Sequence, residues 1–137
     1  MEQAESMILL DTDVLINLFD PFKSNHDIVD ITLKNLLSHN VEMYVSTITE
    51  IELVQGNKSA PDKKKLIKKL ELFKSLGITE DISNTAKNLI FTYSSSHGLF
   101  LADAFIAATA LQLEIPLFTF NKKDYKFIKN LKLYEPK

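Results

Sequence analysis

Met7-Ile-Leu-Leu-Asp-Thr-Asp-Val-Leu-Ile-Asn-Leu-Phe19 is the part of the sequence that says most about the fold. Its first four residues are apolar, which predicts a short buried strand with Asp11 at its carboxyl end. The apolar residues that follow recur at helical spacing, which predicts a helix that ends before Pro21. Asp11 or Asp13 is the expected N-cap of this helix. A strand followed at once by an amphipathic helix is the unit from which α/β folds are built.

The same alternation continues along the rest of the chain. Helical periodicity predicts helices at residues 25–39, 47–56, 61–76, 81–93 and 101–114, with a loop at 94–98 and a turn at 121–124. Short apolar runs predict strands at residues 43–46, 77–79, 115–119 and 131–134. Thr47 and Glu50 match a capping box, which gives Glu50 a structural role. This order predicts a small parallel sheet covered by helices on both faces.

Length and composition narrow the class of protein. A chain of 137 residues, 45% hydrophobic and 25% charged, suits one globular domain. Without Cys there are no disulfides or thiol nucleophiles, and without Arg there is no arginine finger. A net charge of −2 gives no global basic field for binding nucleic acid. The apolar runs are too short to cross a membrane and the start of the chain is unlike a signal peptide, so we expect a cytoplasmic protein.

Asp103 is the most informative acid in the sequence. The residues three, four and seven positions after it are Ile106, Ala107 and Ala110, so its carboxylate lies on an apolar helix face, with Thr109 on the opposite side. A buried, unpaired carboxylate costs several kcal/mol unless its pKa rises or a base or metal ion accompanies it. The alternative interpretation is a first-turn acid that interacts with the helix dipole.

Three further acids follow predicted strands or begin predicted helices. Asp11 lies at the carboxyl edge of the sheet, where open α/β folds bind ligands. Glu50 and Glu52 point to nearly opposite sides of their helix, and Glu52 is the one left for a cleft once Glu50 completes the capping box. Asp124 lies in the turn after a strand. The alternatives are an N-cap for Asp11, a solvated helix acid for Glu52 and a surface turn residue for Asp124.

Together these four acids suggest a metal centre at one edge of the sheet. Clustered carboxylates repel one another unless cations lie among them, and hard oxygen ligands suit Mg²⁺ or Mn²⁺. Such ions activate water and stabilise the charge that builds on a phosphodiester during displacement. The side chains of Thr12, Ser46, Thr119 and Asn121 are expected at the same edge, where they would orient water or phosphate if they do not serve as caps and turns.

The only local basic cluster near an acid of this set surrounds Asp124. Lys122, Lys123 and Lys126 are interleaved with aromatic residues, a pattern suited to holding a polyanion. The lysines of residues 63–69 are interpreted as a solvated helix face.

Four segments carry a family resemblance that spans residues 7–134. They read Ile8-Leu-Leu-Asp-Thr-Asp-Val-Leu-Ile16, Ser46-Thr-Ile-Thr-Glu-Ile-Glu-Leu-Val-Gln-Gly56, Gly98-Leu-Phe-Leu-Ala-Asp-Ala-Phe-Ile-Ala-Ala-Thr-Ala110 and Pro116-Leu-Phe-Thr-Phe-Asn-Lys-Lys-Asp-Tyr125. In this order and at these separations they resemble the PIN domain family, and more narrowly the VapC-type ribonuclease toxins of VapBC toxin–antitoxin pairs.

The resemblance implies a fold, an activity and partners. The fold would be a three-layer α/β/α sandwich with a central, mainly parallel sheet of four to five strands, spanning residues 1–137 as one domain. The activity would be Mg²⁺- or Mn²⁺-dependent endonucleolytic cleavage of RNA. Asp11, Glu52, Asp103 and Asp124 would bind the metal and catalyse, supported by Thr12 and Asn121. The partners would be an RNA substrate, a second copy in a homodimer, and an antitoxin whose C-terminal segment enters the cleft.

Two features of the sequence depart from the family pattern. Phe120 occupies a position where the family commonly has a basic residue, and residues 1–6 are expected to be a disordered extension before the first strand.

Three alternative functions accompany these expectations. One is a PIN-like module that binds RNA or protein without catalysis, and a second is an RNA-processing PIN nuclease outside a toxin operon. The third is a phosphoryl-handling α/β protein that uses Asp11 as a nucleophile.

Overall fold

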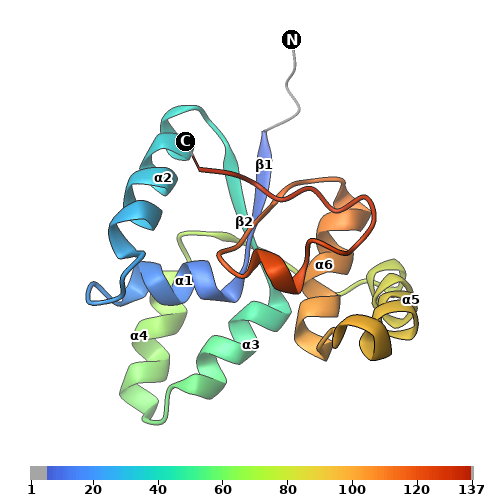
Figure 1. Cartoon of the computed structure of the whole chain (residues 1–137). Coiled ribbons are helices and arrows are strands. Elements are labelled where there is room, and N and C mark those ends of the chain that lie inside the picture. The colour runs from blue at the N-terminus through green and yellow to red at the C-terminus, as the bar shows by residue number, and fades with distance from the viewer. Residues whose placement is uncertain (1–5, 137) are drawn as a thin grey trace.

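A four-stranded, all-parallel sheet forms the centre of the molecule, as the computed structural model of residues 6–136 shows (Figure 1). The strands are β1 (Met7–Leu10), β2 (Glu42–Ser46), β3 (Lys74–Leu76) and β4 (Leu117–Phe118), in the order β3-β2-β1-β4. The expected disordered extension lies outside the described residues except for Ser6, which is exposed. β1 is central and pairs with both β2 and β4, so the residues that follow β1 and β4 emerge side by side.

Helices cover both faces of this sheet. They are α1 (Thr12–Phe19), α2 (His26–Ser38), α3 (Thr47–Gly56), α4 (Ala60–Leu70), α5 (Glu80–His97) and α6 (Leu101–Leu113), followed by a short 3-10 helix, η1 (Lys122–Asp124). Figure 1 shows α1, α2 and α4 on one side and α5 and α6 on the other. None of the helices in residues 6–136 is long and apolar enough to cross a membrane.

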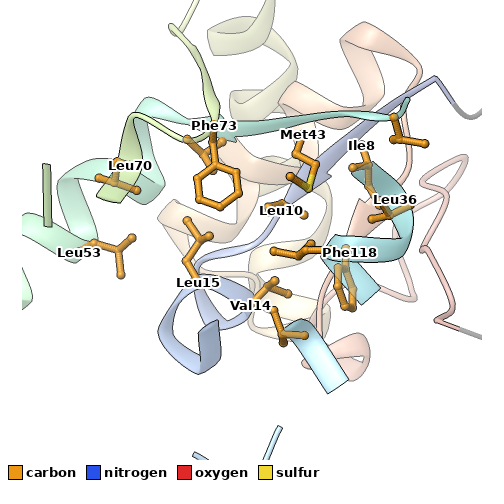
Figure 2. Close-up of a cluster of buried hydrophobic side chains, with 14 of the residues drawn as sticks. Ile8, Leu10, Val14, Leu15, Leu36, Met43, Leu53, Leu70, Phe73 and Phe118 are labelled. Carbon is orange, nitrogen blue, oxygen red and sulfur yellow. The ribbon is translucent and has the colours of Figure 1, made fainter. Parts of the chain in front are cut away.

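Two hydrophobic clusters, one on each face, hold the layers together. Ile8 and Leu10 of β1 pack in the first cluster with residues of α1, α2, α3 and α4, as Figure 2 shows. Leu9 points the other way and packs in the second cluster, which α5 and α6 supply. This alternation along a strand buried on both faces is the expected basis of a three-layer sandwich, and it confirms the predicted fold class.

The third strand does not lie where the sequence predicts it. A single helix over residues 61–76 and a strand at 77–79 are wrong, because α4 ends at Leu70 and the strand is Lys74–Leu76, paired with β2. Phe73 is the reason for the error: it is buried in the same cluster as Leu66 and Leu70, so it continues the helical spacing although the chain has left the helix.

Other boundaries are wrong for local reasons. The expected loop at 94–98 is mostly the last turn of α5, which ends at Gly98 with a left-handed φ of 67°. The expected strand at 131–134 is reduced to one bridge, between Leu117 and Leu133. Thr109 is buried rather than on an exposed side of α6, because α6 is enclosed by its neighbours and the Thr109 hydroxyl donates to its own helix, at Phe105 O.

The predicted capping box of Thr47 and Glu50 is also wrong. Ser46 is the N-cap of α3 and accepts from the Ile48 N–H, while Glu50 accepts from the Ser75 hydroxyl on β3 at 2.7 Å. Glu50 therefore ties α3 to the edge strand rather than closing its own helix.

Candidate active site

The carboxyl edge of β1 and β4 places Asp11 at the centre of the candidate site. Asp11 is 4% exposed and is the N-cap of α1, where its Oδ1 accepts from the Thr12 N–H at 2.8 Å. Its Oδ2 accepts from the hydroxyl of Thr119, which follows β4, at 2.7 Å. The N-cap and ligand interpretations of Asp11 are therefore compatible, since the cap uses only one carboxylate oxygen.

Asp103 is brought to Asp11 by a shared partner. The Tyr125 hydroxyl lies 3.1 Å from Asp103 Oδ1 and 3.1 Å from Asp11 Oδ1. Asp103 projects from the first turn of α6, as its helical position predicts, and its side chain is partly buried. Two carboxylates that are distant in the sequence thus meet at one hydroxyl.

Burial and the charges of neighbouring carboxylates raise the pKa values of both acids. Burial, followed by the charge of Asp13, raises the pKa of Asp11 to about 7. Burial, followed by the charge of Asp11, raises the pKa of Asp103 to about 6. None of the ion pairs among the described residues includes either acid. A buried acid beside a partly buried one, with no base paired to either, is the arrangement that a cation would stabilise.

Glu52 is held near this pair by α1. Its Oε1 accepts from the Thr12 hydroxyl at 2.6 Å, and Thr12 immediately follows Asp11. The same hydroxyl lies 3.0 Å from that of Thr49, which is buried. Glu52 and Glu50 therefore point to different parts of the molecule, as their separation in the helix predicts.

Asp124 is the most loosely placed of the four acids. It ends η1 and receives no side-chain hydrogen bond from the described part of the chain, but its charge and that of Glu52 both contribute to the raised pKa of Asp103. Within residues 6–136 no three carboxylate or imidazole groups lie close enough together to hold a metal ion as they stand. The four acids share one edge of the sheet, but only Asp11 and Asp103 share a hydrogen-bond partner.

The remaining predicted residues fall into two groups. Thr119 bonds Asp11, and the Asn121 N–H donates to the Thr119 hydroxyl at 2.9 Å while its side chain is exposed. Lys122 is paired with Glu135, whereas Lys123 and Lys126 are exposed and form no ion pair with described residues.

Sequence reasoning missed Asp13 and Tyr125. Asp13 is not the N-cap of α1: its Oδ2 accepts from the Phe120 N–H at 2.9 Å, and its buried Oδ1 receives no hydrogen bond from the described residues. Tyr125 lies between Lys123 and Lys126 in the sequence, so it is one of the aromatic residues of the predicted polyanion-binding pattern, but it is only 1% exposed. A buried tyrosine hydroxyl requires a polar partner, and two acids were available, which is the signal that could have identified it.

The donor set fits a hard divalent cation. Its atoms are carboxylate oxygens, the ligands that Mg²⁺ and Mn²⁺ prefer. The buried Oδ1 of Asp13 receives no hydrogen bond from the described residues, and burial raises the pKa values of Asp11 and Asp103, so a cation at this edge would favour the charged forms of these acids.

Comparisons with known proteins agree with this fold. The chain belongs to the PIN domain family, whose model matches residues 8–130. Within that family it is a homologue of the VapC ribonuclease toxins of VapBC toxin–antitoxin systems. Ribonuclease VapC1 of Methanocaldococcus jannaschii is 31% identical over 139 residues, covering 98% of this chain and 92% of the relative.

Two solved structures extend the comparison. A toxin–antitoxin complex from Klebsiella pneumoniae is 27% identical with a TM-score of 0.70, covering 95% of this chain and 98% of that chain. VapBC-1 from nontypeable Haemophilus influenzae is 25% identical with a TM-score of 0.77, covering 94% and 97%. The similarity therefore extends over nearly the whole fold in both structures.

Proposed function

We propose that the protein is a Mg²⁺- or Mn²⁺-dependent endoribonuclease, the toxin of a type II toxin–antitoxin pair, acting as a single domain. The observation that carries this proposal is the pair formed by Asp11 and Asp103, two acids that share one hydroxyl and have raised pKa values without a basic partner among the described residues. Similarity to ribonuclease VapC1 supports RNA as the substrate.

Asp11, Glu52, Asp103 and Asp124 would hold the metal in this mechanism. A bound divalent cation supplies an activated water and neutralises charge that develops on the phosphodiester. Thr119 fixes the rotamer of Asp11, and Thr12 holds Glu52 beside it. Because no three ligands are gathered among the described residues, Glu52 and Asp124 would have to turn towards Asp11 and Asp103 to share a cation with them.

Cleavage of a mixed RNA pool tests the proposal. The purified protein is incubated with Mg²⁺, Mn²⁺ or EDTA, and we expect discrete fragments with a metal and intact RNA in EDTA. Fragments that persist in EDTA, or no cleavage with either metal together with no metal-induced rise in Tm, would contradict it.

Lys123 and Lys126 are proposed to hold the RNA backbone, because both are exposed beside Asp124 and form no ion pair with described residues. In the double variant Lys123→Gln/Lys126→Gln we expect a higher KM, an unchanged kcat, and a salt dependence of RNA binding that is shallower by about 1.4 in log–log slope, or about 0.7 per phosphate contact. Filter binding at several salt concentrations measures this slope. Lys64→Gln/Lys68→Gln, on the exposed face of α4, is the matched control and should leave the slope unchanged.

A homodimer and an antitoxin complex are the proposed assemblies. Large apolar side chains are exposed on α5 and at the start of α6, at Phe91, Phe100 and Leu101. A separate hollow of about 520 Å³ is lined by residues of α3 that include Ile51 and Val54. Exposed apolar surface of this kind marks interaction sites. Light scattering after size exclusion should give twice the 15.6 kDa of one chain; a monomer at every concentration would contradict the dimer.

A PIN-like module without catalysis is the second candidate function. The absence of a ready three-ligand group within residues 6–136 favours it. It predicts binding of RNA or protein with no metal-dependent cleavage, so the RNA pool experiment separates the two. An RNA-processing nuclease outside a toxin operon would cleave but would have no antitoxin encoded beside it.

A further inference from the structure

Tyr125 occupies a position between Asp11 and Asp103 that no other described side chain shares. Its ring packs in the second hydrophobic cluster, among residues of α5, α6 and β4, and only 1% of the residue is exposed. Its hydroxyl reaches Oδ1 of Asp11 and Oδ1 of Asp103 at the same distance, 3.1 Å. The hydroxyl therefore approaches both carboxylates from the hydrophobic core.

The hydrogen bonds around the two acids are divided unevenly between their oxygens. Asp11 Oδ1 accepts from both Tyr125 and the Thr12 N–H, whereas its Oδ2 accepts from Thr119. Asp103 Oδ1 is the second contact of the Tyr125 hydroxyl, whose single proton the two carboxylates share, and its Oδ2 accepts no hydrogen bond from the described residues. The Tyr125 contacts thus occupy one oxygen of each carboxylate, and lone pairs stay available on the other oxygen of each.

The Tyr125 hydroxyl also bears on the repulsion between the two acids. A neutral phenol with one proton between two acids reduces their repulsion but does not neutralise their charge, and the remaining charge is what a divalent cation would bind.

We propose that Tyr125 is a positioning residue that fixes Oδ1 of Asp11 and of Asp103 from the core side, so that Oδ2 of each is presented to a divalent cation. This inference rests on the proposed metal-dependent function. Hydrogen bonds from neighbouring groups orient carboxylate ligands before the metal arrives, and loss of such a partner typically costs about 10- to 100-fold in metal affinity. Without this hydroxyl, Asp103 keeps no side-chain hydrogen bond from the described residues and is free to rotate away from Asp11, which Thr12 and Thr119 still hold.

Calorimetric titration of the full chain with Mn²⁺ tests the role of Tyr125. In Tyr125→Phe the ring and its packing stay, and we expect Mn²⁺ affinity to fall about 10-fold or more, together with a lower Tm in EDTA, because Asp103 then loses its hydrogen bond. Tyr93→Phe is the matched control: Tyr93 packs against the same cluster, but its hydroxyl accepts from the Lys129 N–H instead of contacting an acid. Tyr93→Phe should bind Mn²⁺ like the wild type.

The possible outcomes separate this inference from the proposed function. If the wild type binds no Mn²⁺, the metal-dependent function fails and the role of Tyr125 fails with it. If the wild type binds and Tyr125→Phe binds equally well, only the positioning role is overturned. Equal losses in Tyr125→Phe and Tyr93→Phe, or a Tyr125→Phe protein that does not fold, would also overturn it, because the hydroxyl would then serve the core rather than the metal.

Discussion

Asp103→Asn is expected to lower metal-dependent RNA cleavage by at least about 100-fold while it stabilises the metal-free protein. The amide retains the shape of the side chain but removes a charge that lies near Asp11 and among partly buried groups. At pH 8 we expect the free energy of unfolding of the metal-free protein to rise by roughly 1 kcal/mol. This is less than the full pKa shift implies, because the side chain is only partly buried. Cleavage of labelled RNA with Mn²⁺ and thermal unfolding in EDTA measure the two effects.

Asp81→Asn is the matched control for Asp103→Asn. Asp81 is also a first-turn acid, on the adjacent helix α5, but it is exposed. If Asp103 only interacted with the helix dipole, both variants would lose a few tenths of a kcal/mol to about 1 kcal/mol of folding stability, and both would still cleave RNA. A cleaving Asp103→Asn protein would contradict the proposed catalytic role.

Local periodicity was sufficient to place the acids in the fold. The apolar neighbours of Asp103 in α6 predicted an inward carboxylate, and the structure brings it to Asp11 through Tyr125. The two-residue separation of Glu50 and Glu52 predicted that they point apart, and they contact β3 and α1 respectively. Both arguments depend on one helix at a time, which is why sequence alone could support them.

Features that depend on contacts between distant segments were not predictable in the same way. Tyr125 is 114 residues from Asp11, and nothing in its own segment shows that its hydroxyl lies between two acids. The strand Lys74–Leu76 carries little apolar signal of its own and exists because it pairs with β2. Ser46 took the capping role expected of Thr47, whose hydroxyl donates to Leu76 O across the sheet edge. Tertiary hydrogen bonds decided each of these cases.

Metal-induced stabilisation is expected to be large at pH 8 and small at pH 5. In the unfolded chain both acids titrate near 3.8, but in the folded protein the pKa is about 7 for Asp11 and about 6 for Asp103. Because the folded state holds these protons at higher pH, their contribution to the free energy of unfolding is most favourable below about pH 4 and declines as the pH rises towards 7. Metal binding requires the deprotonated carboxylates, so it opposes this loss only at the higher pH.

Thermal unfolding from pH 4 to 9, with EDTA or with saturating Mn²⁺, tests this linkage between protons and metal. At 100 times its Kd the metal should contribute about 2.7 kcal/mol at pH 8. In Asp103→Asn we expect a shallower decline of metal-free stability between about pH 4 and 6, because the Asp103 contribution is gone while that of Asp11 remains. A Mn²⁺-induced Tm shift of the same size at pH 5 and pH 8 would show that the cation binds away from these two acids. The proposed mechanism would then lose its metal site, since the protons and the cation must compete for the same carboxylate oxygens.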